Sequence, residues 1–583
     1  MIRALALRLT RAISFGHRWY HDAWQRVRSQ SIAFLILTTL SGAIGSLSHC
    51  SACAEEPIGS ARAEEPFGSA CAEEPLGKGT AVVEDVAILN PHPKKMGVKE
   101  CAACHTQPGF LYPKTGVTQF VRLTEAVQWN DRDKHAYAYE LVRIDLSDSE
   151  FDQPKRISNR RARDMLTKLG WQTGDNRFER QCLSCHAGLD PSADLSTVSL
   201  RENIAYGVQC EACHGPGENY MHSSEHQQPT WRTKSPDEKA LLGMTDLSNA
   251  AVCSEVCLSC HLGNLASGRF VTHEMYAAGH PPLPPFDLQT FLDAMPPHWG
   301  TIQEKPYPNA FVKDASRFQY EREYLQNHFA LDPSQSTAEM RDRIQQSNER
   351  SKRSMISAMM TENASLQLLH DASRQQNVWG DYALFDCMGC HQSLDQGRSR
   401  FRPAGRIPGR PFPPTWSTVS DSLTGSRPSS APIQAKINEV FNSIPFGDRE
   451  RWELAKPSFE RFLVDRRNLA MSWSKKVVDA SETKDWVEQL IQDQSPKLND
   501  YWVAKQTAWM VQIAVQELIA RKQLPPSLVD DHLQPLDRIL GLNLAIPQQQ
   551  SVLAGQPATL NTAQSFDIAA VRDHLESIRR SLR

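Results

Sequence analysis

One arrangement of cysteine and histidine, Cys-x-x-Cys-His, occurs five times in this chain of 583 residues and accounts for ten of its 14 cysteines. In chain order the five copies, here called sites 1 to 5, are Cys101/Cys104/His105, Cys182/Cys185/His186, Cys210/Cys213/His214, Cys257/Cys260/His261 and Cys387/Cys390/His391. Positions i, i+3 and i+4 share one face of a helix, so each copy places two thiols and one imidazole together. This pattern is typical of c-type haem attachment, in which the thiols bond the porphyrin and the imidazole binds the iron. The sequence therefore predicts five covalently attached haem c groups.

Zinc ribbons and disulfide frameworks are the other common reason for paired cysteines. Neither requires a histidine directly after the second cysteine, and histidine occupies only 19 of the 583 positions. Five such coincidences favour haem attachment.

The remaining histidines also concentrate near the five sites. Nine of them lie between residues 92 and 370, whereas only His532 and His574 follow His391. We therefore expect several of the nine to bind an iron from the opposite side, as its sixth ligand. From their local context we select His135, His222, His280, His273 and His370, and not His92, His226, His298 or His328. Because His222 follows His214 by only eight residues, we expect it to bind a neighbouring haem.

The N-terminal residues indicate export. Residues 1–31 carry six arginines, residues 32–47 are largely apolar, and Ala52-Cys53-Ala54 has the form of a small-residue cleavage site. We interpret residues 1–54 as a cleaved signal peptide, with a retained N-terminal anchor as the alternative. Either one places the bulk of the protein in the periplasm, and any membrane contact would be through this segment alone.

The rest of the chain divides by composition. A nine-residue repeat occurs three times in residues 51–77, so we predict an acidic repeat linker over 55–97. A pentahaem domain is predicted over 98–400, a Pro/Arg-rich arm over 401–432 and a helical region over 433–583. With 64 basic against 67 acidic residues, the chain is not expected to bind nucleic acid. The predicted fold is mainly α with extensive loops.

Two helical features of the second half are predicted from residue patterns. Asn499 or Asp500 should cap a helix with an apolar face through Val503, Met510, Ala514 and Leu518. A last helix should present Ile568, Val571, Leu575, Ile578 and Leu582. The polar tract at 337–376 either carries His370 over the haems or forms a solvated helix pair.

Three segments resemble the cytochrome c-552/c-554-like multihaem proteins. They are residues 134–136 (KHA), 207–217 (GVQCEACHGPG) and 273–282 (HEMYAAGHPP). The resemblance extends over about residues 98–400. It implies closely spaced haems, mostly with two axial histidines, that pass electrons in the periplasm, and it makes His135 and His222 distal ligands. Some relatives keep one five-coordinate haem that reacts with small nitrogen oxides.

The chain also departs from that family. The four-haem members lack a counterpart of site 5, and Gln392 follows His391 where related fifth sites often have a second histidine. The chain has no Cys-x-x-Cys-Lys copy, which is the catalytic site of nitrite-reducing cytochromes. We predict a periplasmic pentahaem cytochrome that relays electrons between redox partner proteins, without catalytic residues. The alternative is a multihaem oxidoreductase with one open iron that acts on a small nitrogen or sulfur oxide.

Overall fold

The computed structural model describes much of the chain from residue 93 to the C-terminus. The described residues are 93–106, 124–143, 157–172, 176–189, 204–223, 226, 231, 234–298, 322, 325–326, 331–332, 334–375, 378–391, 409, 411, 430–442, 444–542 and 566–583. The predicted leader, the repeat linker up to residue 92 and most of the 401–432 arm lie outside them, as do His92 and His328.

Helices form nearly all of the regular structure among these residues. Backbone pairing outside helices consists there of two isolated bridges, between Asn264 and Arg269 and between Phe385 and Pro411. The predicted mainly α fold with extensive loops is thus confirmed. None of the helices described combines the length and the apolarity needed to cross a lipid bilayer.

Short helices carry the five sites. In site order they are α2 (Val98–His105), α6 (Leu183–His186), α8 (Cys210–His214), α11 (Ala250–His261) and α17 (Cys387–Cys390). The elements between them are α3 (Glu125–Arg132), η1 (Lys134–Leu141), α4 (Ile157–Leu169), α5 (Asn176–Gln181), α9 (Glu218–Met221), α10 (Pro236–Leu241), η6 (Leu265–Ser267), α12 (His273–Ala278), α13 (Leu288–Ala294), α15 (Thr337–Gln346), α16 (Glu349–Ser373) and η7 (Tyr382–Leu384). The apolar clusters around sites 1 and 2 are small.

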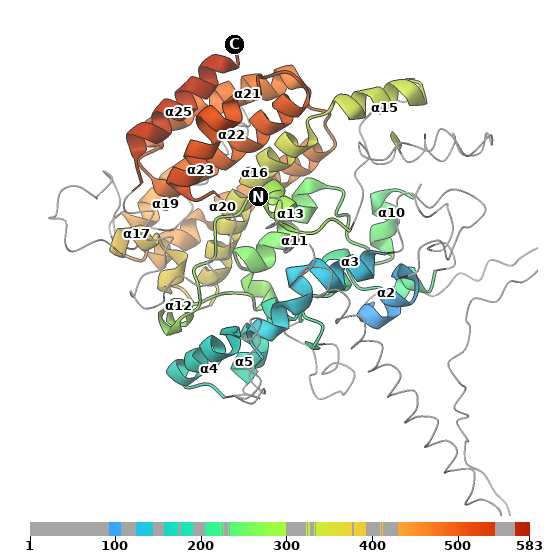
Figure 1. Cartoon of the computed structure of the whole chain (residues 1–583). Coiled ribbons are helices and arrows are strands. Elements are labelled where there is room, and N and C mark those ends of the chain that lie inside the picture. The colour runs from blue at the N-terminus through green and yellow to red at the C-terminus, as the bar shows by residue number, and fades with distance from the viewer. Residues whose placement is uncertain are drawn as a thin grey trace, which may run out of the picture. The chain divides into compact units, whose positions relative to one another are not determined.

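Helix α16 connects this region with the C-terminal helices (Figure 1). It packs against α11 and α13 on one side and against α20 (Arg449–Ser474) and α22 (Tyr501–Ala520) on the other. Its side chains are buried almost throughout, polar ones such as Ser354 and Thr361 included. The prediction of a solvated helix pair is therefore wrong for α16, because four helices cover it.

The C-terminal helices form the largest apolar core among the described residues. Beyond α20 and α22 they are α19 (Ala431–Phe441), α21 (Ala480–Gln494), η8 (Ser495–Lys497), η9 (Val529–Leu533), α23 (Gln534–Leu540) and α25 (Ile568–Ser581). Asp500 caps α22 as predicted, since its carboxylate accepts hydrogen bonds from the backbone of Trp502 (2.8 Å) and Val503 (3.2 Å). Helix α22 is buried nearly all round, polar residues such as Gln506 and Thr507 included, which suits a helix covered on several sides.

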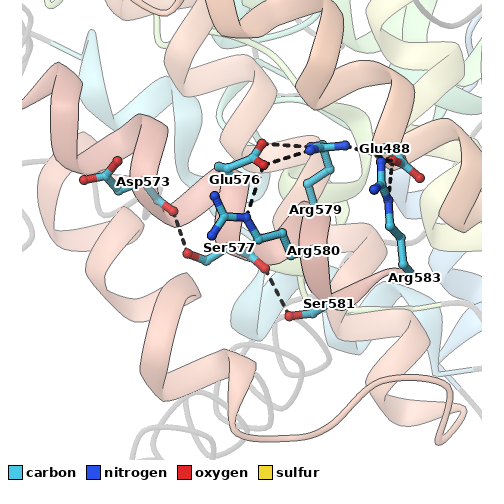
Figure 2. Close-up of polar contacts among 8 residues, drawn as sticks. All are labelled: Glu488, Asp573, Glu576, Ser577, Arg579, Arg580, Ser581 and Arg583. Atoms are coloured by element: carbon cyan, nitrogen blue, oxygen red, sulfur yellow. Dashed lines mark hydrogen bonds and ion pairs between the residues drawn. The ribbon is translucent and has the colours of Figure 1, made fainter.

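The last helix, α25, packs on α21 and α23 through the predicted apolar face, with Val571, Leu575 and Ile578 fully buried. Figure 2 shows the polar rim of this contact, where Arg579 and Arg583 both lie against Glu488 of α21, at 2.9 and 2.6 Å. Ion pairs that are open to solvent on one side add little stability, so the apolar face holds α25 in place.

Helix α20 fixes the helix that carries site 4. The Ser474 hydroxyl accepts a hydrogen bond of 2.7 Å from the backbone of Ala250 at the start of α11. Arg467 forms a two-pronged ion pair with Glu255 of α11, in which Nη2 donates to Oε2 at 2.9 Å. The C-terminal helices are thus in direct contact with the element that presents Cys257, Cys260 and His261.

Candidate haem sites

Each predicted site lies on one helical turn, as the spacing requires. In α11 the two cysteines and His261 form the last turn of a twelve-residue helix whose start is capped by Asn249. In α8 the copy is the whole helix, which ends where Gly215 turns the chain with φ of 82°. The two thiols and the imidazole of a copy are therefore presented by a single short element.

The cysteines of the five copies lie near the surface of these elements. Cys390 of site 5 is exposed, and the other nine are half-buried: Cys101, Cys104, Cys182, Cys185, Cys210, Cys213, Cys257, Cys260 and Cys387. None of the ten is completely buried as a residue.

Three of the five site histidines face a second histidine from another part of the chain. The ring centroids are 6.2 Å apart for His135 and His261, 6.3 Å for His214 and His298, and 6.3 Å for His273 and His391. Imidazole nitrogens bind metals at about 2 Å, so two rings on opposite sides of one metal have centroids about 6 Å apart. The three pairs have the spacing of axial ligands to a single iron.

Each of the other two site histidines lies close enough to a second histidine to lower the pKa of that second histidine. Burial first, and the charge of His186 to a smaller extent, lower the pKa of His280 to about 4. In the same way burial, followed by the charge of His105, lowers the pKa of His226 to about 4. His226 also packs against the rings of Trp231 (5.0 Å) and Tyr220 (5.6 Å).

Hydrogen bonds to Nδ1 leave Nε2 of four of these imidazoles for a metal. The Nδ1 atoms lie against Glu125 Oε2 for His105 (3.0 Å), Asp133 Oδ1 for His135 (2.9 Å), the Ala138 carbonyl for His186 (2.9 Å) and the Pro281 carbonyl for His280 (2.7 Å). Metal-binding histidines almost always donate their other N–H in this way, because the bond fixes the tautomer and the ring orientation.

Burial keeps the inner imidazoles neutral, which is the form that binds metals. It lowers the pKa of His214 and of His261 to about 4. For His135 burial alone would also lower the pKa, but the hydrogen bond and the charge of Asp133 outweigh it and raise that pKa. The carboxylate of Asp133 is itself buried, 3% exposed, so it pairs with His135 away from bulk water.

The sites are in contact through their cysteines, in an order that differs from the sequence. The Cys101 thiol of site 1 lies against Cys210 of site 3, and this contact is the main cause that raises the pKa of Cys101. The Cys185 thiol of site 2 lies against Cys260 of site 4, which likewise raises the pKa of Cys185. Sites 1 and 3 are thus neighbours, and so are sites 2 and 4.

Cys104, the second cysteine of site 1, is assigned from the sequence spacing, whereas Cys101 also contacts another site. It lies in the last turn of α2, where its backbone carbonyl accepts a hydrogen bond from the N–H of Thr106 as the helix ends. The contact with site 3 concerns Cys101, three residues earlier on the same helix. The predicted thioether bond of Cys104 to a haem rests on the Cys-x-x-Cys-His spacing alone, and it stays a prediction.

Glu211, inside the third copy, holds sites 1 and 3 together. Its buried carboxylate accepts hydrogen bonds from the backbone of Met96 (2.8 Å), Gly97 (2.7 Å) and Gly217 (2.7 Å). Hydrogen bonds to a charged acceptor are among the stronger ones in proteins. The GVQCEACHGPG segment therefore positions the start of α2 as well as its own helix.

Two of the histidines selected from the sequence are not placed beside a site histidine. His222 is exposed at the end of α9, and the nearby His226 is the one that lies close to His105. His370 is buried in α16, where Nε2 lies 3.2 Å from Glu460 Oε1 and Nδ1 lies 3.4 Å from Asp371 Oδ1. Both of its ring nitrogens face carboxylates.

The sequence reasoning missed His226 and His298 as partners and also missed the carboxylates that orient the rings. Asp133 could have been identified from the sequence, because an acidic residue two positions before His135 can cap the turn that carries His135. His226 and His298 lie outside the long helices, and no motif marks them.

Comparison with known proteins gives a family match for part of the chain. Residues 100–215 match the family described as cytochrome c554 and c-prime, and this span contains sites 1 to 3 together with His135. No curated protein and no solved structure gave a match. Over residues 100–215 this chain is therefore similar to the c554-like c-type cytochromes, a family of electron-transfer proteins with covalently bound haem c.

Proposed function

We propose that this protein is a periplasmic pentahaem cytochrome that relays electrons between redox partner proteins through closely spaced haems with two axial histidines each. The observation that carries the proposal is the common spacing of three histidine pairs, 6.2 to 6.3 Å between ring centroids. The five Cys-x-x-Cys-His copies support the haem count.

The cysteines, the histidines and the carboxylates would each have a distinct role in holding the haems. Bound haem supplies an iron that takes up and releases one electron. The cysteine pairs would hold each porphyrin, and the histidine pairs would hold each iron. We assign His261 to His135, His214 to His298, His391 to His273, His186 to His280 and His105 to His226. Asp133 and Glu125 orient their imidazoles and would favour the more positive, oxidised state of a bound metal.

A relay is favoured over catalysis because every site histidine has a second histidine in its neighbourhood. An iron with two protein ligands offers no position to a substrate. The oxidoreductase alternative, with a small nitrogen or sulfur oxide as substrate, would need one of these partners to be absent. An open iron is best placed at site 1 or site 2. There the second histidine is identified by the effect of the site histidine on the pKa of His226 or His280. In the other three pairs the ring centroids lie 6.2 to 6.3 Å apart.

The compartment is inferred from chemistry. Thioether attachment of haem takes place outside the cytoplasm, and the N-terminal 54 residues have the form of an export segment. Fractionation of cells that express the full chain should recover the haem-stained protein outside the cytoplasm, in the soluble fraction for a cleaved signal and in the membrane fraction for an anchor.

Two measurements test the proposal together. Mass spectrometry and a pyridine haemochrome assay should both count five haems per chain. Carbon monoxide added to the reduced protein should then leave the spectrum unchanged, because no iron has a free position. A spectral change in one haem would favour the oxidoreductase, and fewer than five haems would refute the pentahaem assignment.

A further inference from the structure

Residues 273–280 carry two histidines that face different sites. His273 begins α12, where the Thr272 hydroxyl accepts a hydrogen bond from the backbone of Met275. His280 follows the end of the helix, after Gly279 turns the chain with φ of 126°. At 1.5 Å per helical residue, the two histidines are only about 10 Å apart along the segment.

His273, the first of the two histidines, is held beside the segment of site 5. The backbone N–H of His273 donates to Asp381 Oδ1 at 3.0 Å, and the Tyr382 ring lies 5.2 Å from the His273 ring. Asp381 and Tyr382 lie six and five residues before Cys387 of site 5, whose His391 ring is 6.3 Å from His273. The start of α12 is therefore held next to the segment of site 5 by a hydrogen bond from its backbone and by a ring contact.

His280, the second histidine, follows the end of α12, which packs against the elements that support site 2. Helix α12 packs on α4, and the Lys168 ammonium of α4 donates to the Ala278 carbonyl at 3.1 Å. Helix α4 packs in turn on η1, which contacts the α6 helix of site 2. The Ala138 carbonyl of η1 orients His186 at 2.9 Å. The end of α12 is thus connected to site 2 through α4 and η1.

Tyr276 lies between the two ends. Its ring is 5.8 Å from the His280 ring, and it projects from the middle of α12. The Tyr276 side chain is half-buried there, so α12 carries an aromatic ring between its two histidines.

We infer that site 5 joins the relay at site 2, and not at site 4, which precedes it in the sequence. This inference rests on the proposed function. Neighbouring irons interact by Coulomb's law, which is strong in the interior of a protein and falls with distance. The oxidation state of the haem at site 5 should therefore affect the midpoint potential at site 2 more than that of any other haem.

A double-variant cycle on the full haem-loaded protein tests the contact. The variants are His273→Met and His280→Met, singly and together, because a Met ligand raises the potential of the iron that it binds. Spectroelectrochemical titration should show one raised midpoint in each single variant. The shifts in the double variant should differ from the sum of the single shifts. The matched control is His273→Met with His135→Met, which should be additive within error.

The outcomes separate this inference from the proposed function. If His273→Met and His280→Met each change one haem and their effects are additive, sites 2 and 5 are not neighbours and the inference is wrong. A larger coupling with His135→Met would connect site 5 to site 4 instead and would overturn it too. If neither single variant alters any haem spectrum, the ligand assignment itself fails.

A second variant covers the case in which a Met ligand prevents maturation. Cys387→Ala with Cys390→Ala removes the attachment of site 5 and leaves the other four copies intact. We expect four haems and a midpoint shift that is largest for the haem identified by His280→Met, or by loss of its low-spin signal in His280→Ala. A largest shift at any other haem contradicts the inference, as does the absence of any shift.

Discussion

Gly207 lies so close to His135 that a Cβ atom on Gly207 would be 2.4 Å from the His135 carbonyl oxygen. The same oxygen accepts a hydrogen bond of 2.9 Å from the backbone of Val208. The segment that leads into site 3 is thus pressed against the backbone of the residue that faces site 4 at His261. Gly207 also has φ of 66°, which other residues rarely adopt.

We predict that Gly207→Ala destabilises the protein and displaces His135. Gly170→Ala is a matched control, since Gly170 also has φ of 66° but nothing lies within 4 Å of an added Cβ. The control should cost about 1 kcal/mol for the backbone conformation, and Gly207→Ala should cost about 2 kcal/mol more. Thermal unfolding measures the difference, and equal losses in the two variants would contradict the close contact.

Removal of a distal histidine should open one iron. In His298→Ala we expect one haem to change from low spin to high spin and to bind carbon monoxide when reduced. The exposed His222 supplies the control, since His222→Ala should leave the spectrum of every haem unchanged. Carbon monoxide binding in the His222 variant instead would restore His222 as a ligand.

The carboxylate of Asp133 should lower the potential of the haem that His135 and His261 are proposed to share. Asp133→Asn keeps the shape of the side chain but removes the charge that supports the oxidised metal. We expect the midpoint to rise by an amount on the order of 60 mV, which is a tenfold change for one electron. Spectroelectrochemistry measures it, with Asp131→Asn as the control for loss of a nearby exposed charge. An unchanged midpoint would show that the carboxylate does not act on the metal.

Glu211→Gln should loosen the contact between sites 1 and 3. A glutamine has one acceptor oxygen and no charge, so at least one of the three backbone N–H groups now bound would lose its partner in a buried place. Each hydrogen bond to a charged group contributes about 1.5 to 3 kcal/mol, so a loss of several kcal/mol is expected. Thermal unfolding and the haem count per chain report it. The exposed capping residue Glu238 gives the control, and a Glu238→Gln variant should be the milder of the two.

The C-terminal helices should become more stable as the pH rises from 8 towards 10. Burial lowers the pKa of Lys505 to about 8, and its ammonium donates to the Gly541 carbonyl at 2.7 Å. In the unfolded chain a lysine titrates near 10.4, so between these values the unfolded state binds more protons and the free energy of unfolding increases with pH. The gain is at most about 3 kcal/mol. Burial raises the pKa of the neighbouring Tyr501 to about 12, so stability should fall again above pH 10.

Urea unfolding followed by circular dichroism at several pH values measures this dependence. Lys505→Met removes the titrating group and should flatten the rise between pH 8 and 10. A rise of the same size in that variant would assign it to another group.

Two helices of the second half, α22 and α25, could be predicted well because their signals are local. Asp500 caps α22 and the apolar spacing of α25 marks its buried face, and both follow from the period of a helix. The central position of α16 could not be predicted in this way. Its sequence is polar enough for a solvated helix, and only the four helices packed around it explain why serines and a glutamate are buried there.

By itself the sequence predicts the five attachment sites, because two thiols and an imidazole within one helical turn are fixed by the spacing of the residues. Tertiary structure alone decided which second histidine faces each of them. His226 and His222 are four residues apart, and His298 and His370 are equally plausible by composition, yet only His226 and His298 lie near a site histidine. The partner on the far side comes from an element distant in the chain, so its identity depends on how helices pack and not on the residues beside it.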